Sequence, residues 1–265
     1  MESDASNIRG WALSEGDNLL VKASSQLSQT NRSTNKHTNT ITILIMGCTE
    51  SAPVANAFER VHKPLGPSLG ANFGVSIPTT KQQLIVKEKL FCWSGDSFKI
   101  KHTNGQLFGN GLGIRGKAFS FRDQMVLEDA NRRPVLVCLR KFQFGGQSFK
   151  IYTTKPNYPG QQRSTQKLDG MALYTYASVE RRPMELVQSV SIETAQGPRP
   201  LYKIHRVGAW FPKKRSVKHR GEDVAFMEGG TWGGNCNTYR VTIAPGIDAC
   251  LMVCLCAICD EMDEK

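Results

Sequence analysis

The sequence predicts a mainly β protein in which antiparallel strands close into a barrel around a buried C-terminal helix. Residues 249–259 contain no polar side chain except four thiols, and a helix that is apolar on every side must be enclosed on every side. From Gln82 onward, short strand patterns alternate with turn signals at roughly eight- to twelve-residue intervals, which is typical of sandwiches and barrels. A barrel encloses one helix most simply, so both observations predict the same fold.

The apolar run 249–259 is too short to cross a membrane. A spanning helix needs about 20 apolar residues, and these eleven residues, at about 1.5 Å each, cover only about half of the hydrocarbon thickness. Extending the run backwards adds Pro245, Gly246 and Asp248, and a carboxylate at the bilayer centre costs about 2.5–3.5 kcal/mol. Asp248 is instead predicted to cap a helix that begins at Ala249, after the Pro-Gly pair has broken the preceding strand.

Strand patterns fill the chain upstream of this helix. Phe98, Ile100 and His102 alternate before Asn104-Gly105, a dipeptide favoured in tight hairpins. No stretch before the helix has a convincing period of about 3.6 residues, and the count of roughly ten to twelve strands suits a closed barrel. Further strands are predicted at Phe119 and Phe121, Met125–Leu127, Val135–Leu139, Phe149–Tyr152, Met171–Val179, Glu185–Glu193, Leu201–Val207, Val224–Met227 and Tyr239–Ile243.

Composition divides the chain into three parts. Residues 1–45 are predicted to be disordered, because the stretch from Ala23 to Thr40 is almost entirely Ser, Thr, Asn, Gln and basic residues and cannot bury enough apolar surface to fold. Residues 46–80 contain an acylation motif and then a linker with four prolines and scattered glycines. Residues 81–265 are predicted to form the barrel domain.

The acylation motif is Met46-Gly-Cys-Thr-Glu-Ser51, which matches the pattern for myristoylation with a cysteine placed for palmitoylation. Myristoyl transfer needs a free N-terminal glycine, so two interpretations stay open. Either translation starts at Met46 and residues 1–45 are not translated, or the match is a coincidence in a linker. Under the first interpretation, Gly47 and Cys48 carry the acyl chains.

Three longer motifs occur in order along the predicted barrel. They are Leu90-Phe-Cys-Trp-Ser-Gly-Asp-Ser-Phe-Lys-Ile100, then Gly116-Lys-Ala-Phe-Ser-Phe-Arg-Asp-Gln-Met-Val-Leu127, then Ile243-Ala-Pro-Gly-Ile-Asp-Ala249 followed by the apolar run. In this order and spacing they resemble the LURP-one-related family, and the resemblance covers about residues 80–265.

The resemblance implies the tubby C-terminal-like fold, which phospholipid scramblases also resemble: a closed antiparallel barrel of about twelve strands around a central C-terminal helix. It suggests a membrane-linked regulatory role and supplies no catalytic residues. The chain departs from the family in two places. Phe108–Arg115 is rich in glycine and expected to be a lengthened hairpin loop, and Arg163–Asp169 is polar and expected to be a disordered excursion.

The charge favours anionic partners. There are 34 Lys and Arg residues against 23 Asp and Glu, a net charge of +11 that suits phosphoinositide headgroups, acidic proteins or nucleic acid. The eight cysteines have no framework spacing, which suits a reducing cytosol better than a secreted disulfide scaffold. The polar first ten residues argue against a secretory signal.

Two patterns that resemble binding motifs are better explained by structure. On a helix, Cys250 and Cys254 lie on one side and Cys256 and Cys259 on the other, so one metal ion cannot reach all four and the thiols are predicted to pack as small apolar groups. The glycines of 111–116 satisfy G-x-G-x-x-G, but the following residues read as a strand, whereas a dinucleotide site needs a helix there. A hairpin loop is predicted instead.

No catalytic constellation stands out. The sequence contains neither G-x-S-x-G nor H-E-x-x-H, and its five histidines are scattered without ligand spacing. The protein is therefore predicted not to be an enzyme and to need no cofactor and no metal.

One basic run remains as a candidate binding site. Lys213-Lys-Arg-Ser-Val-Lys-His-Arg220 holds five cations in eight residues, beside Trp210 and Phe211, and such clusters attract anionic leaflets. Three interpretations stay open: a solvated loop that balances the acidic residues after the helix, an anionic-lipid site, or a signal for nuclear import or nucleic-acid contact. The candidate headgroup contacts are Lys213, Lys214, Arg215, Lys218 and Arg220.

These observations predict a non-enzymatic, monomeric regulatory protein that binds anionic, phosphoinositide-like lipid at the cytosolic face of a membrane, with the plasma membrane favoured and the nucleus as an alternative. A single myristoyl chain binds membranes only marginally, so Cys48 or the basic run would supply the second attachment. A scramblase-like lipid transporter and a nuclear or membrane-tethered transcription regulator remain alternatives. Nucleic acid is the less favoured partner, because aromatic residues are only 8% of the chain and no stacking motif is present. Protein partners are not indicated.

Overall fold

The computed structural model describes residues 9–12, 21–24, 42–44, 58–66, 68–88, 97–117, 124–143, 146–182, 187–208, 213–230 and 238–263. The chain divides into two compact units, Met1–Ser51 and Ala52–Lys265. In the first unit, β1 (Arg9–Ala12), β2 (Val21–Ser24) and β3 (Thr42–Leu44) pair as an antiparallel sheet. The disorder expected over residues 1–45 stays a prediction for the rest of this stretch, and Gly47 and Cys48 lie outside the described residues.

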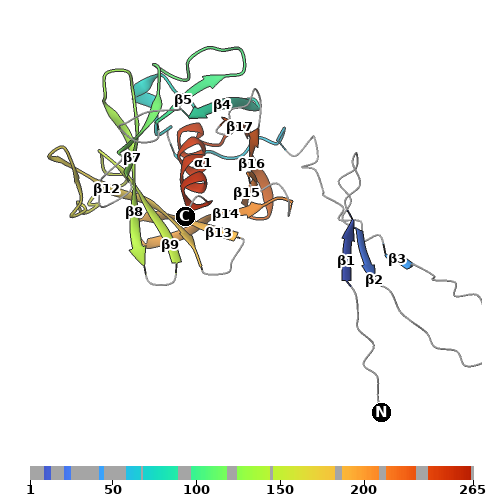
Figure 1. Ribbon diagram of the computed structural model, residues 1–265. Helices are drawn as coiled ribbons and strands as arrows, with labels where there is room; N and C mark the ends of the chain where they lie inside the picture. Colours follow the sequence, from blue (N-terminus) through green and yellow to red (C-terminus); the bar gives the residue numbers. More distant parts are fainter. Residues whose placement is uncertain are drawn as a thin grey trace, which may run out of the picture. The chain divides into compact units, whose positions relative to one another are not determined.

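The second unit is a closed antiparallel barrel of twelve strands, as the sequence predicts (Figure 1). Neighbouring strands follow the chain order except at two places, where β17 pairs with β4 and β9 pairs with β12. Because the ring closes, the barrel leaves no strand edge open. The strands are β4 (Gln82–Glu88), β5 (Ser97–His102), β6 (Gly113–Lys117), β7 (Gln124–Glu128), β8 (Pro134–Gln143), β9 (Gly146–Thr153), β12 (Tyr174–Arg181), β13 (Val187–Thr194), β14 (Gly197–Arg206), β15 (Lys214–His219), β16 (Glu222–Gly230) and β17 (Thr238–Ile243).

The C-terminal helix α1 (Ala249–Asp263) lies inside this ring of strands (Figure 1). Every residue from Ala249 to Asp260 is buried, which confirms that the apolar run is enclosed by the barrel. Asp248 caps the helix as predicted, because its Oδ1 accepts a hydrogen bond of 2.9 Å from the backbone N–H of Leu251. The strand residues that face α1 alternate with exposed ones, as Phe98 and Ile100 do on β5.

A second apolar cluster lies on the outer surface of the wall. Val126, Val137 and Tyr152 pack there against Leu168 and Leu173, and they form a group distinct from the core around α1. Leu168 belongs to a small hairpin of β10 (Lys167–Leu168) and β11 (Met171–Ala172). The disordered excursion expected at 163–169 is therefore wrong, because a leucine within it buries its side chain against the barrel.

The segment 58–80, which we call the strap, packs on the barrel end that holds the N-terminus of α1. Its Phe58 and Val75 are part of the core. The backbone N–H of His62 donates to the carbonyl oxygen of Pro245 at 2.9 Å, and that of Leu69 donates to Oδ2 of Asp248 at 2.8 Å. The linker over residues 52–80 stays a prediction. Within the described residues of the strap, the one regular element is the 3₁₀ turn η1 (Ala71–Phe73).

Two further expectations about loops change. Gly113–Lys117 pairs with β5 and β7 as strand β6, so only the first part of the glycine-rich stretch 108–115 is a loop. The basic run is also a strand rather than a loop, because residues 214–219 pair with β14 and β16 as β15. Side chains of this run therefore alternate between the barrel interior and its outer surface.

Candidate functional sites on the barrel

Strand β15 separates the five predicted lipid contacts. Arg215 faces the interior and its side chain is only 6% exposed, whereas Lys214 and Lys218 face outward. Lys213 precedes the strand and Arg220 lies in the exposed turn after it, with a left-handed φ of 51°. The five cations thus do not form one surface.

Arg215 contacts the end of α1. Its Nη2 donates to the carbonyl oxygen of Cys259 at 3.3 Å and also pairs with the carboxylate of Asp263. Burial opposes the charged guanidinium, but the electrostatic interaction with Cys259 and the hydrogen bond and charge of Asp263 outweigh it, so the pKa of Arg215 is raised above its ordinary value. A buried arginine in these contacts is held by the protein and is not available to a membrane.

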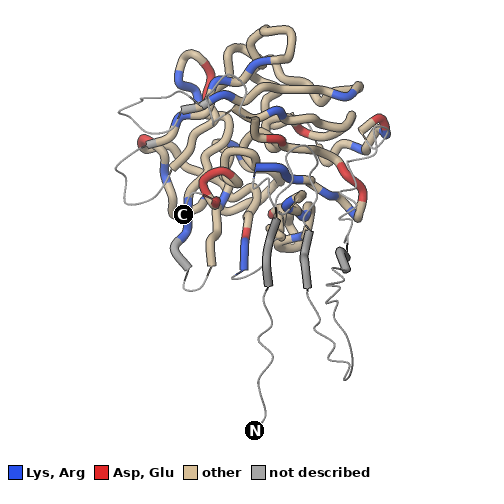
Figure 2. Tube along the Cα trace, turned by 45° about the vertical axis from the view of Figure 1, so that its right-hand side comes forward, with Lys and Arg blue, Asp and Glu red and all other residues tan. Residues whose placement is uncertain are grey.

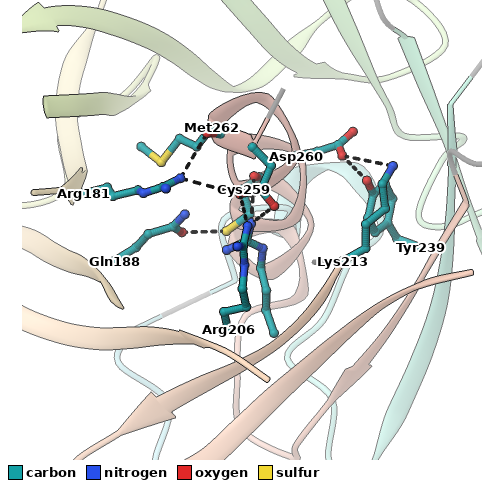
Figure 3. Close-up of polar contacts among 10 residues, drawn as sticks. Arg181, Gln188, Arg206, Lys213, Tyr239, Cys259, Asp260 and Met262 are labelled. Carbon is teal, nitrogen blue, oxygen red and sulfur yellow. Dashed lines mark hydrogen bonds and ion pairs between the residues drawn. The ribbon is translucent and has the colours of Figure 1, made fainter. Parts of the chain in front are cut away.

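Two more arginines reach the same helix end from two other strands of the wall, β14 and β12 (Figure 3). Arg206, opposite Arg215 in the β14–β15 register, donates to Oδ1 of Asp263 at 3.0 Å. Arg181 of β12 donates to the carbonyl oxygen of Met262 at 3.2 Å. The last carbonyl groups of a helix have no intrahelical hydrogen-bond donors and lie at the negative end of its dipole. Arginines placed there donate hydrogen bonds to these carbonyls and are attracted by the dipole.

Asp260 occupies the other side of the helix end. The hydroxyl of Tyr239 donates to it, and Nζ of Lys213 lies 3.8 Å from its Oδ1. Lys213 also lies 5.4 Å from the centre of the Tyr239 ring, a cation–π contact. Burial raises the pKa of Asp260 despite the hydrogen bond from Tyr239 and the charge of Lys213. The sequence predicts that the acidic residues follow the helix. In the structure α1 continues through Asp260, Glu261 and Asp263, so this expectation is wrong for these three residues.

These contacts define the helix-end cluster, which joins six charged side chains from the wall and the helix. One of the three interpretations of the basic run, charge balance with the acidic end of the helix, holds for Lys213 and Arg215, although the run is not a solvated loop. Chemically, the cluster fixes the helix inside the barrel rather than presenting a reactive group. Its members are Arg181, Arg206, Lys213, Arg215, Asp260 and Asp263.

The helix thiols are packing groups, as predicted. Cys250, Cys254, Cys256 and Cys259 are free and fully buried. Burial raises the pKa of Cys259 to about 11 and the pKa values of Cys250 and Cys256 well above the ordinary thiol value. A hydrogen bond with Cys138, together with burial, does the same for Cys254, so all four thiols stay protonated. In the part of the chain that the structure describes, no three His, Cys, Asp or Glu side chains lie together as metal ligands.

An exposed group of cations lies on the outer surface of five neighbouring strands. A cross-strand row runs from Lys214 through Glu228 and Arg240 to Ile85 and Lys101. Lys87 and Lys99 face each other in an adjacent row. Figure 2 shows Lys and Arg on many strands and hairpins of the barrel. We call the following set the outer basic face: Lys87, Lys99, Lys101, Lys214 and Arg240.

Three members of the outer basic face are free of carboxylates. Lys87, Lys99 and Lys101 are exposed, and no described Asp or Glu forms an ion pair with them. Lys214, in contrast, lies 3.4 Å from Glu228. Leu107, 59% exposed, forms a bridge with Lys101 and adds an apolar side chain beside the cations. These lysines stand singly in the sequence, so no basic run marks them. The alternation with Phe98 and Ile100 does predict that Lys99 and Lys101 point outward.

The remaining predicted contacts stay apart from this face. Lys218 lies 3.0 Å from Asp223, its neighbour on β16. Arg220 is exposed at the turn beside the strap, where Arg60 pairs with Glu222. Whether any of the five candidates contacts a headgroup stays a prediction, and Arg215 is the one whose burial argues against it.

Two comparisons bear on identity. A family model described as LURP-one-related matches residues 82–260, from the first barrel strand into α1. No curated protein matches the chain. Across the described residues, no helix has the length and hydrophobicity needed to cross a membrane.

Proposed function

The chain belongs to the LURP-one-related family, and on that premise we propose that it is a non-enzymatic regulatory protein that binds anionic phospholipid at the cytosolic face of a membrane and acts in signalling or defence-type responses. The observation that carries the lipid proposal is the outer basic face. The family match alone does not identify a ligand, so the proposal rests on the charge and exposure of this surface.

Electrostatics favour this surface over the basic run. Each cation near an anionic leaflet contributes about 1 kcal/mol of attraction if it faces the membrane. Lys87, Lys99 and Lys101 meet this condition, because their side chains point outward and no described carboxylate neutralises them. Lys213 and Arg215 do not, since they hold the helix end. The proposed contacts therefore move from the run to the outer basic face, which keeps Lys214.

A second attachment would make binding stable. One acyl chain holds a protein at a membrane only marginally, and a polybasic surface is a sufficient partner for it. If translation starts at Met46, a myristoyl group on Gly47 and a palmitoyl group on Cys48 would act together with the outer basic face. Leu107, exposed beside Lys101, would enter the headgroup region.

Co-sedimentation with vesicles tests the lipid proposal. The full chain is mixed with vesicles of phosphatidylcholine alone, with added phosphatidylserine, or with added phosphatidylinositol bisphosphate. We expect binding to either anionic mixture, weakened as salt shortens the Debye length below about 10 Å. The triple variant Lys87→Gln, Lys99→Gln, Lys101→Gln should bind about a hundredfold more weakly, because three attractions of about 1 kcal/mol each are lost.

A matched control separates location from net charge. The variant Lys63→Gln, Lys167→Gln, Lys203→Gln removes the same charge from exposed lysines elsewhere on this unit. It should bind nearly as well as the unmodified chain. If both triple variants lost the same affinity for anionic vesicles, binding would depend on net charge alone, and the outer basic face would not be the lipid-binding surface.

A further inference from the structure

A cavity of about 730 Å³ lies at the barrel end that holds the N-terminus of α1. One wall is the strap, with Leu69 and Phe73, and the others are the ends of strands β8, β9, β12, β13 and β14. Asp248 and Leu251 of the helix start complete the lining. Sites for small organic ligands in proteins measure about 300–1,000 Å³, so the barrel-end cavity has the volume of such a site.

Two tyrosines line this cavity, and both phenol groups feel the charge of Asp248 in the same lining. Tyr176 of β12 and Tyr202 of β14 line it, and their side chains are otherwise buried, with 9% and 4% exposure. Within the described residues neither hydroxyl has a hydrogen-bond partner, whereas the hydroxyl of Tyr239 donates to Asp260. Neither hydroxyl belongs to the fully buried side-chain atoms of the described residues that lack a partner, so both are accessible to a molecule in the cavity. Such a molecule would supply a hydrogen-bond partner to both.

The charge around the hydroxyls restricts that molecule. Burial raises the pKa values of Tyr176 and Tyr202, and the nearby Asp248 carboxyl raises them further, so both phenols stay neutral. Asp248 already accepts backbone hydrogen bonds from Leu69 and Leu251. Burial raises the pKa of Asp248, and its two oxygens are occupied by these backbone N–H groups, so it offers an anionic group no favourable contact. An uncharged hydroxyl or carbonyl is the complement of the two neutral phenols.

The rest of the lining mixes apolar and polar side chains. Leu69, Phe73, Ile192 and Leu251 contribute hydrocarbon surface. Two cations also line the cavity: Arg133 pairs with Asp129 at 2.6 Å and lies 5.5 Å from the centre of the Phe73 ring, and Lys155 is exposed to solvent. A ligand therefore gains from burying an apolar body here, while a few polar groups orient it.

We propose that the barrel-end cavity binds an uncharged, mainly apolar small molecule through hydrogen bonds from its hydroxyl or carbonyl group to Tyr176 and Tyr202. This site is separate from the outer basic face and does not depend on membrane binding. Because the strap forms one wall, an occupant would join the strap to the barrel and stabilise both by an amount that grows with the logarithm of its concentration above the dissociation constant.

Titration of the full chain with Nile red, an uncharged dye with a carbonyl oxygen, tests the proposal. Its fluorescence should rise to saturation on binding. Tyr176→Phe and Tyr202→Phe each remove one hydroxyl and should each raise the dissociation constant about fivefold, the effect of one neutral hydrogen bond. Tyr174→Phe is the control, since Tyr174 is on the same strand but accepts from Arg163 outside the cavity and should bind the dye normally.

Three further results decide the matter. Ile192→Trp fills the cavity and should abolish saturable binding while the far-ultraviolet circular dichroism stays unchanged. The anionic dye 8-anilinonaphthalene-1-sulfonate should not displace Nile red. Unchanged affinity in the Tyr176→Phe, Tyr202→Phe double variant, displacement by the anionic dye, or no saturable binding at all would each overturn the proposal.

Discussion

The guanidinium group of Arg215 donates a hydrogen bond to the backbone carbonyl oxygen of Cys259, 3.3 Å away, and so joins the barrel wall to the end of the enclosed helix. Arg181 makes the equivalent contact with Met262 from another strand. At the opposite end, Asp248 caps the helix and also holds Leu69 of the strap. The helix is therefore fixed at both ends by polar contacts. Between them its side chains pack against the barrel wall, and the Cys259 thiol donates to Oε1 of Gln188 at 2.8 Å.

Replacing Arg215 should destabilise the fold strongly. Arg215→Met leaves the Asp263 carboxylate and the Cys259 carbonyl without this donor in a largely buried site, which should lower the free energy of unfolding by about 3–5 kcal/mol. Urea denaturation measures the change. Arg199→Met removes an exposed arginine from β14 and should stay within about 0.5 kcal/mol of the unmodified chain. Similar losses in the two variants would contradict a structural role for Arg215.

Asp260 should make stability depend on pH in a definite direction. Because burial raises its pKa in the folded state, the folded protein binds more protons than the unfolded chain as the pH rises from 3.8 through the raised pKa, and stability falls over that window. Asp260→Asn removes this titrating group and its contribution to the pH dependence of stability, while the asparagine oxygen can still accept a hydrogen bond from Tyr239. The free energy of unfolding of the variant, minus that of the unmodified chain, should therefore increase across the window. A constant difference would show that Asp260 does not titrate there.

Gly246 should not tolerate a side chain. A Cβ at this position would lie 1.8 Å from the carbonyl oxygen of His62, and the residue has a left-handed φ of 85°. Gly246→Ala should therefore push the strap from the barrel end and cost more than about 2 kcal/mol of unfolding free energy. The matched control is Gly197→Ala, where φ is 103° but nothing lies within 4 Å, so only backbone strain of about 1 kcal/mol is expected. Equal losses would mean that the strap does not pack at Gly246.

Gly47 decides the acylation hypothesis. Protein purified from its native cell should have the mass of a chain that starts at Gly47 and carries acyl groups, and Gly47→Ala should shift it from membrane to cytosolic fractions. Cys48→Ala should reduce membrane retention less, because the myristoyl group and the outer basic face remain. Identical partitioning of Gly47→Ala and the unmodified protein, or an unmodified product that starts at Met1, would end this part of the proposal.

The features predictable from sequence are those that depend on neighbouring residues. The thiol-containing apolar run, the cap at Asp248 and the alternation around Ile100 each carry their own signal within a few positions. Strand β15 has no such signal, because an arginine at an inward position interrupts the alternation of apolar and polar residues. Only the structure shows that Arg215 points inward and pairs with Asp263. The sequence resemblance to the LURP-one-related family, confirmed by the family match, supplies the strand count that the patterns alone leave between about ten and twelve.

The strap and the outer basic face depend on long-range geometry instead. Phe58 and Val75 are isolated apolar residues among prolines and glycines, and only the backbone contacts of the strap with Pro245 and Asp248 show that they are buried. Lys87 and Lys99 belong to different strands, and their proximity follows from the register of β4 with β5. No local pattern encodes that register before the strands are paired.

The order of elements also has a consequence for synthesis. The barrel ring closes only when β17 pairs with β4, across a separation that runs from Gln82 to Ile243, and the helix that fills the ring follows after Asp248. During translation the early strands therefore leave the ribosome with their inward apolar faces uncovered, and they stay so until β17 and α1 have been added. Deletion of α1 would leave a ring of strands with nothing to fold around.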